Sequence, residues 1–295
     1  MFQNAPNGDL HFIMDNQIVA ISSTNGILTQ NSIITKTVGN YGTSNPIVAR
    51  TTLQAEKLLG ASSIAFDQEN SNQFREIVAS YRDRLLTMDE SREYLLAEII
   101  RCDKEFNYSS GPIQLPQVTN LRTKVEEFLL NSKKTLAEIS KLFTLFFNYQ
   151  KIGPDYDSHL VWAKNHFSGN SIITKVLEAN TTGDRWINFI CDLRNRIEHP
   201  KENYWMKIHN IDFDPQTKKM ISPRWSTENS SEFDLLHDIG AIINNTLLLS
   251  EDLVAGCINE TLTAPAIFGI GSIPKNQIDP NLPFRWGIFT NLPNS

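Results

Sequence analysis

WINFICDLRNRIEHP, residues 186–200, has the pattern of one amphipathic helix, and the rest of the chain is interpreted around it. Apolar side chains recur there at spacings of three and four residues, which predicts a single buried stripe. The stripe consists of Trp186, Phe189, Ile190, Leu193 and Ile197. The side-chain oxygens that would cap the start of the helix belong to Thr181, Thr182 and Asp184. Pro200 would end the helix, because its ring disfavours helical backbone angles at His199.

The opposite face of this predicted helix is polar and consists of Asn188, Asp192, Asn195 and His199. A face that only meets solvent more often carries Lys, Glu or Gln, because Asn and Asp are poor helix formers. Short polar groups that end in a histidine, flanked by Arg194 and Arg196, suit a polar cleft. The alternative is an ordinary solvated face, in which Asp192 pairs with Arg196 and Arg194 pairs with Glu198 four residues further on.

The segment Arg194–His199, RNRIEH, resembles the R-x4-H signature of the HEPN superfamily. The direct likeness covers residues 186–200, and the helical pattern from about residue 70 to 262 agrees with it loosely. The resemblance implies a helical bundle. In members that are ribonucleases, it implies a metal-independent cut in which the 2′-hydroxyl attacks the adjacent phosphodiester and leaves a cyclic phosphate. Many HEPN proteins lack catalysis, so a helical binding or dimerisation module stays open, as does a structural protein in which the motif is accidental.

The resemblance also implies roles for individual residues. His199 would move protons near neutral pH, Arg194 would stabilise the charge that develops at phosphorus, and Asn195 would orient the phosphate or the histidine. The surrounding residues expected to bind the substrate are Arg196, Lys201, Asp192 and Asn188. On an ideal helix Arg194 and His199 point about 140° apart. The family arrangement is a homodimer in which two motif helices face each other and share one cleft.

Composition limits the classes of function. The chain has 295 residues, 40% of them hydrophobic, and a net charge of −6, which argues against a broadly basic surface but allows a local patch for RNA. Its three cysteines lie far apart without a CxxC or Cys/His cluster, so we expect no metal and no cofactor. Since neither a signal peptide nor a long apolar run is visible, we expect a cytoplasmic protein without a membrane partner. The reading as a HEPN-type ribonuclease of a toxin, defence or stress system therefore rests on the resemblance, and a cleft with two copies of Arg194, Arg196 and Lys201 could supply its positive charge.

The organisation along the chain predicts a mainly α fold, with a HEPN-like helical bundle between two extended segments. Residues 1–60 contain β-branched runs separated by turn residues, which predict an N-terminal β segment. Residues 61–263 carry helical periodicity and form the expected helical domain. Within it, residues 203–225 alternate between apolar and polar side chains, which predicts a β-hairpin inserted after the motif helix. Residues 264–295 are rich in proline and glycine, so we expect an extended tail that packs on the body.

The helical domain should contain several helices besides the motif helix. Thr87 and Glu90 form a possible capping box, so the first part is either two helices or one kinked helix. A long helix should run from Pro116 to about Tyr149. Two short helices are expected within residues 157–180, and a last long helix from Ser231 to about Leu262.

Overall fold

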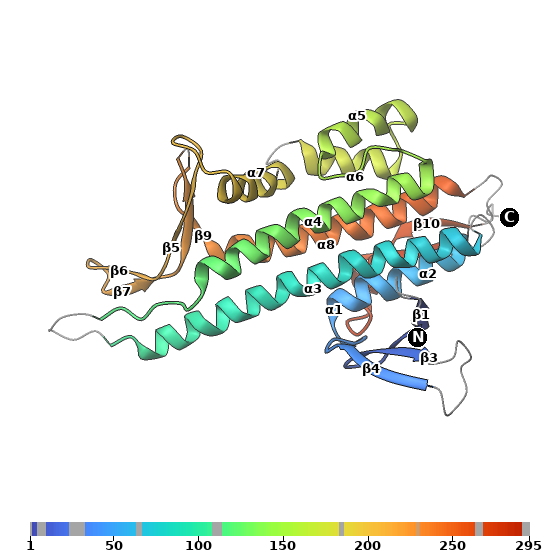
Figure 1. Cartoon of the computed structure of the whole chain (residues 1–295). Helices are drawn as coiled ribbons and strands as arrows, with labels where there is room; N and C mark the ends of the chain where they lie inside the picture. The colour runs from blue at the N-terminus through green and yellow to red at the C-terminus, as the bar shows by residue number, and fades with distance from the viewer. Residues whose placement is uncertain are drawn as a thin grey trace. The chain divides into compact units, whose positions relative to one another are not determined.

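The computed structural model describes residues 2–4, 10–23, 33–62, 67–107, 114–182, 186–228, 230–262 and 268–290. Within this part the chain is mainly helical with small antiparallel sheets, which confirms the predicted fold class (Figure 1). The chain divides into two compact units whose segments alternate along the sequence. The first unit comprises residues 1–83, 136–183 and 247–295, and the second comprises residues 84–135 and 184–246.

The helices are α1 (Pro46–Val48), the π-helix η1 (Ala49–Leu53), α2 (Gln54–Ser62), α3 (Gln68–Glu105), α4 (Leu121–Phe147), α5 (Tyr156–His166), α6 (Ile172–Thr181), α7 (Trp186–Glu198), α8 (Leu235–Thr261) and the short 3-10 helix η2 (Lys275–Gln277). The strands are β1 (Phe2–Asn4), β2 (Leu10–Ile13), β3 (Ile18–Ser23), β4 (Ile33–Gly39), β5 (Met206–His209), β6 (Asp212–Asp214), β7 (Lys219–Ile221), β8 (Arg224–Thr227), β9 (Phe233–Asp234), β10 (Phe268–Ser272) and β11 (Trp286–Thr290). Helices α3, α4 and α8 each contribute residues to both units.

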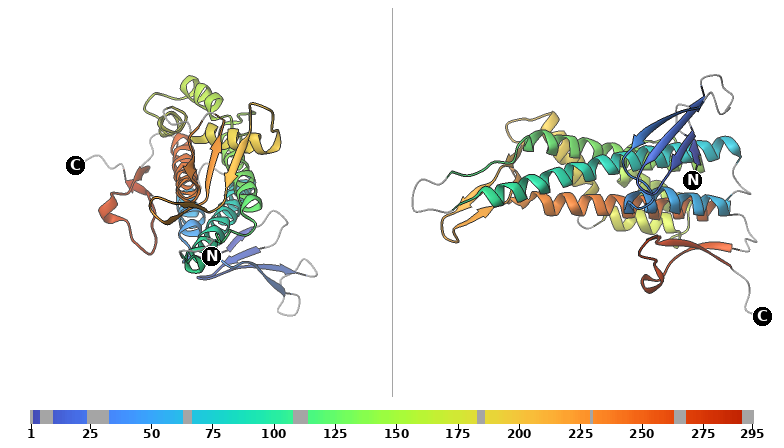
Figure 2. Two further views of the ribbon diagram at one scale, coloured as in Figure 1. Left: turned by 90° about the vertical axis from the view of Figure 1, so that its left-hand side faces the viewer. Right: turned by 90° about the horizontal axis from the view of Figure 1, so that it is seen from below.

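The first unit contains two small sheets of local origin. Strands β1 to β4 form an antiparallel sheet in chain order, as the β-branched runs predict. Strands β10 and β11 form a hairpin in which Ile270 lies opposite Ile288, where the sequence suggests only an extended tail. Figure 2 shows the two sheets outside the helices of this unit and on different sides of them. The helical segment that follows β4 was not predicted. The side chain of Asn45 caps it and Pro46 occupies its first turn.

A buried ionic cluster joins three distant segments within the first unit. The carboxylate of Glu251, in α8, is fully buried and accepts hydrogen bonds from Arg50 of η1 and from Gln54 Nε2 at 3.2 Å. The amide oxygen of Gln54 accepts the backbone N–H groups of Arg285 and Trp286 at 2.6 and 2.9 Å. Because a buried carboxylate is costly unless it is paired and hydrogen-bonded, this cluster fixes the C-terminal hairpin to the helices.

Three helix boundaries differ from the sequence prediction. Helix α3 is unbroken, and the hydroxyl of Ser91 donates back to the Thr87 carbonyl at 3.1 Å, so no capping box interrupts it. Helix α4 begins at Leu121 rather than Pro116, because the Val118 N–H donates to the side chain of Asn210 at 2.9 Å and holds this segment extended. Helix α8 begins four residues late, because β9 pairs with β8 first.

In the second unit, a sheet follows the motif helix, as the alternating pattern of residues 203–225 predicts. Strands β6 and β7 close a hairpin, and β5, β8 and β9 form a three-stranded sheet in which Ile208 lies opposite Trp225. Trp225 is fully buried, and its indole N–H donates to Asp238 of α8 at 2.7 Å. This hydrogen bond anchors the sheet on α8.

Helix α8 is the most apolar helix of the described chain. By length and composition alone its 27 residues could cross a membrane. However, 72% of its most apolar 18-residue window is buried inside the structure. Buried side chains such as Ile239 in the second unit and Leu253 in the first account for this. A helix that is hydrophobic on most sides is also what the core of a bundle requires.

Candidate functional site

The motif helix α7 buries a face that is rotated from the predicted stripe. Ile190 and Leu193 are buried as expected, but Ile187 and Arg196 are buried as well. The predicted stripe members that are only half-buried are Trp186, Phe189 and Ile197. The strands that follow α7 add a second layer of contacts: the Arg196 guanidinium pairs with Glu228, and the Phe189 ring contacts the rings of Trp225 and Phe233. Periodicity alone does not report this second covering layer.

Two of the side chains predicted to cap α7 are hydrogen-bonded to the preceding helix. The hydroxyl of Thr181 donates to the Leu177 carbonyl at 2.7 Å, and that of Thr182 donates to the Glu178 carbonyl at 2.6 Å. Both threonines therefore bond to the last turn of α6, which extends further than predicted. The third candidate, Asp184, lies outside the described residues.

Arg196 is held inside the second unit. Its side chain is 9% exposed, its Nε donates to Asp192 at 2.6 Å, and its guanidinium pairs with the Glu228 carboxylate. The guanidinium also lies over the ring of Tyr204, 4.3 Å from the centroid, and the Tyr204 hydroxyl donates to Asp192 at 2.9 Å. The hydrogen bond from Arg196 holds the pKa of Glu228 below its ordinary value. Two of the residues expected to bind substrate, Arg196 and Asp192, thus tie α7 to the sheet.

Arg194 and His199 converge on one oxygen atom. Arg194 Nη1 forms an ion pair with Oε2 of Glu198, and His199 Nε2 lies 3.7 Å from the same oxygen. Helix α7 ends at Glu198, before Pro200 as predicted, and the freed His199 side chain is 69% exposed. The end of the helix therefore removes the divergence expected on an ideal helix. Among the described residues, the buried Nε of Arg194 has no hydrogen-bond partner.

A second cation reaches the motif from another helix. Lys133 of α4 donates to the side-chain oxygen of Asn195 at 2.9 Å, which places an ammonium group beside the three expected catalytic residues. The sequence pattern does not reveal this role of Lys133, because nothing in the residues around Lys133 connects it with α7. Asn188, which was expected to bind substrate, is half-buried on α7. Lys201 is exposed, and its backbone pairs with Tyr204 at 2.9 and 3.0 Å.

A cavity of about 350 Å³ lies between α4 and α7, beside Arg194. It is lined by Thr123, Glu126, Glu127, Leu129, Leu130, Arg194, Ile197 and Glu198. Two of its carboxylates are already paired, Glu126 with Arg122 at 2.7 Å and Glu127 with Lys124 at 2.8 Å. The cavity is therefore nearly neutral in charge, and the cations of the site are Arg194 and Lys133.

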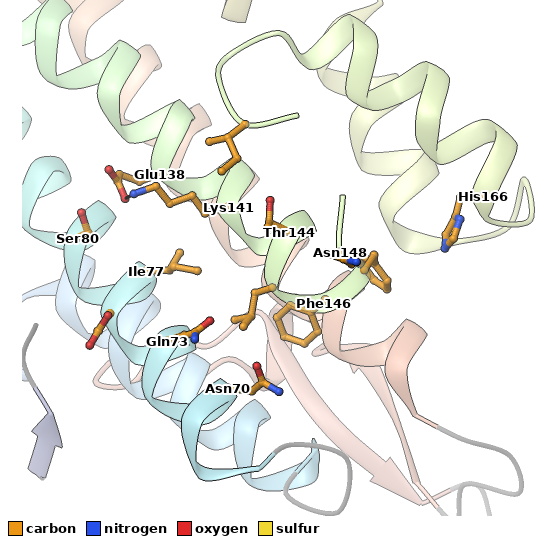
Figure 3. A pocket seen from close by; sticks show the side chains of 14 residues that line it. Asn70, Gln73, Ile77, Ser80, Glu138, Lys141, Thr144, Phe146, Asn148 and His166 are labelled. Carbon is orange, nitrogen blue, oxygen red and sulfur yellow. Dashed lines mark ion pairs between the residues drawn. The ribbon is translucent and has the colours of Figure 1, made fainter. Parts of the chain in front are cut away.

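A larger groove of about 990 Å³ lies in the first unit, between α3 and the end of α4 (Figure 3). Apolar side chains, including Ile77 and Phe146, line its middle. Polar side chains from both helices line its rims: Asn70, Gln73, Glu76, Ser80, Glu138, Lys141, Thr144 and Asn148. None of the seven site residues expected from the sequence lines this groove.

The described residues contain no group of three or more His, Cys, Asp or Glu side chains that could hold a metal ion. Two of the cysteines, Cys102 and Cys257, are buried, and burial raises the pKa of both thiols. A raised thiol pKa disfavours the thiolate that nucleophilic or metal-binding chemistry needs.

No protein-family model, no curated protein and no solved structure matches this chain.

Proposed function

We propose that this chain is a HEPN-like, metal-independent endoribonuclease that acts as a homodimer, with Arg194 and His199 as its catalytic pair. The observation that carries the proposal is that both side chains approach Oε2 of Glu198. A carboxylate oxygen resembles a non-bridging phosphate oxygen in charge and in hydrogen-bond acceptance. A phosphodiester at this position would meet a guanidinium and an imidazole together.

These groups match the needs of RNA cleavage by the 2′-hydroxyl. In the proposed reaction the 2′-oxygen forms a bond to phosphorus, the bond from phosphorus to the 5′-oxygen breaks, and one proton passes from the first oxygen to the second. The exposed imidazole of His199 carries this proton. Arg194 stabilises the negative charge of the pentacoordinate phosphorus, and Lys133 holds Asn195 beside it.

The distinction between the two arginines of the motif supports this assignment. Arg196 is enclosed by Asp192, Glu228 and Tyr204, so its guanidinium is not available to a ligand. The Arg194 side chain is 22% exposed, and its carboxylate partner is Glu198, whose side chain is 36% exposed. Only Arg194 can therefore exchange its partner for a phosphate without breaking the interior of the unit.

The homodimer part of the proposal rests on charge. The chain has a net charge of −6, which disfavours RNA at long range. Two motif helices that face each other across a two-fold axis would double the local number of cations, because each chain would bring its exposed Lys201 and its partly exposed Arg194. Light scattering coupled to size exclusion should give twice the monomer mass at micromolar concentration. A monomer under these conditions would contradict the dimer.

The test of the proposed activity is cleavage of a fluorogenic RNA in the presence of EDTA. We expect cleavage by the wild type to continue, and Arg194→Ala and His199→Ala each to lower it by about 10²-fold or more. Arg122→Ala is the matched control, because Arg122 also forms an ion pair on a helix of the second unit but is 76% exposed. Activity that EDTA abolishes and that magnesium or manganese restores would refute the mechanism.

A second candidate is a non-catalytic, HEPN-like helical module that binds a partner or ligand. The observation that favours it is the groove of about 990 Å³ in the first unit, which has an apolar middle and polar rims but contains no motif residue. Pockets of this size commonly hold organic ligands. If a purified wild type cuts no RNA, a ligand that raises its melting temperature but does not raise that of Ile77→Trp would support this candidate.

A further inference from the structure

We infer that Glu198 is an internal competitor that occupies the anion site formed by Arg194 and His199, and that an incoming phosphate must displace it. The inference rests on the proposed function for the identity of the incoming anion. Its basis is that one oxygen of Glu198 faces both the guanidinium of Arg194 and the imidazole of His199 in the free chain. The site is therefore closed by a residue of its own helix.

The guanidinium of Arg194 has capacity for a larger anion. Its Nη1 pairs with Glu198, while its Nε is buried and has no hydrogen-bond partner among the described residues. Arginine binds carboxylates and phosphates best through two parallel N–H groups. The Nε–H does not share an edge of the guanidinium with Nη1, so the two cannot hold one phosphate in parallel. A phosphate would instead replace the Glu198 carboxylate at Nη1 and present a second oxygen to His199.

Several features make Glu198 a weakly held occupant. It is the last residue of α7, where the helix dipole disfavours a carboxylate. Its side chain is 36% exposed, so water screens the ion pair. The arginine precedes the glutamate, which is the less favourable order for a pair four residues apart.

The neighbouring pair on the same helix shows the contrast. Asp192 precedes Arg196, which is the favourable order for an ion pair four residues apart. The Arg196 guanidinium also pairs with a second carboxylate, that of Glu228. That pair is part of the unit's interior, whereas the pair of Arg194 with Glu198 can open without exposing apolar surface.

The expected effect follows from the fraction of molecules in which the site is open. An exposed ion pair is favoured over its open form by only a few-fold, and apparent affinity falls in proportion to the open fraction. Replacing Glu198 by glutamine also removes a negative charge that faces the bound phosphate. We therefore expect Glu198→Gln to bind a phosphate about 3- to 10-fold more tightly than the wild type.

The experiment measures binding without catalysis. Inorganic phosphate, and in a second series a 2′-O-methylated RNA dinucleotide that cannot be cleaved by this route, are titrated at low ionic strength while NMR follows the imidazole signal of His199. Glu202→Gln is the matched control, because Glu202 is an exposed glutamate that follows α7 and its loss changes the net charge equally. We expect Glu198→Gln to bind more tightly and Glu202→Gln to bind as the wild type does. In an Arg194→Ala background, the gain from Glu198→Gln should disappear.

The inference is overturned if Glu198→Gln binds no more tightly than Glu202→Gln, if the gain persists without Arg194, or if neither probe shifts the His199 signal of any variant. Its failure can be told apart from failure of the proposed function. Tighter phosphate binding without RNA cleavage supports the inference and contradicts the ribonuclease. RNA cleavage by the wild type without tighter phosphate binding by Glu198→Gln supports the ribonuclease and contradicts the inference. Circular dichroism of each variant establishes that the helices are intact.

Discussion

Substitution of Arg196 by alanine should destabilise the protein far more than substitution of Arg194, although the two residues are neighbours in the motif. The Arg196 side chain binds two carboxylates and stacks on Tyr204. Removing one partner of a buried ion pair costs about 3–5 kcal/mol. Because Asp192 is partly exposed, we expect a loss of roughly 2–4 kcal/mol for Arg196→Ala. Arg194→Ala breaks one exposed pair and should cost about 0.5 kcal/mol.

Urea unfolding followed by circular dichroism measures both values, provided that the slope of the transition is unchanged. Arg122→Ala should lose little, since its ion pair is still more exposed than that of Arg194. Arg196→Lys should recover only part of the loss, because an ammonium group cannot bind two carboxylates and stack on Tyr204 with the same geometry. If Arg196→Ala unfolds at the same urea concentration as the wild type, or if Arg194→Ala is equally destabilised, the assignment of one structural and one available arginine is wrong.

Other outcomes follow from the same structure. Because Arg194 and His199 of one chain approach the same oxygen, a mixture of Arg194→Ala and His199→Ala chains should stay inactive; recovered RNA cleavage would show that the pair is shared between chains. Leu193→Ala should lower the free energy of unfolding by about 2–5 kcal/mol, as a buried leucine does, with the loss measured in urea. The hydrogen bond from Arg101 lowers the pKa of Glu98 to about 2 from its ordinary 4.5, so its contribution to stability is present above pH 4.5 and is lost as the pH falls towards 2. As the pH falls from 4.5 towards 2, the free energy of unfolding should fall less for Glu98→Gln than for the wild type. An equal dependence of unfolding free energy on pH in the two proteins would contradict this.

The sequence predicts the elements better than the partners of their side chains. Helix α7 ends before Pro200 as predicted, and both pairs of the alternative reading, Asp192 with Arg196 and Arg194 with Glu198, are present. Both follow from helix geometry within one element. The contacts of Glu228 and Lys133 with α7 come from other elements, so no spacing in the motif could reveal them. The sequence pattern does not separate the helical stretch of residues 46–62 from the β segment before it.

The buried cluster around Glu251 has a consequence for the order of folding. Its partner Arg50 is 201 residues earlier in the chain, and Gln54 is 231 residues before Arg285. Contacts of such sequence separation close late, because the intervening chain must first be ordered. During synthesis, all segments of the second unit leave the ribosome before Glu251 does, whereas the first unit waits for the C-terminal hairpin. Nascent chains should therefore hold a folded second unit beside an open first unit, whose unpaired Arg50 and exposed apolar helices are a target for chaperones.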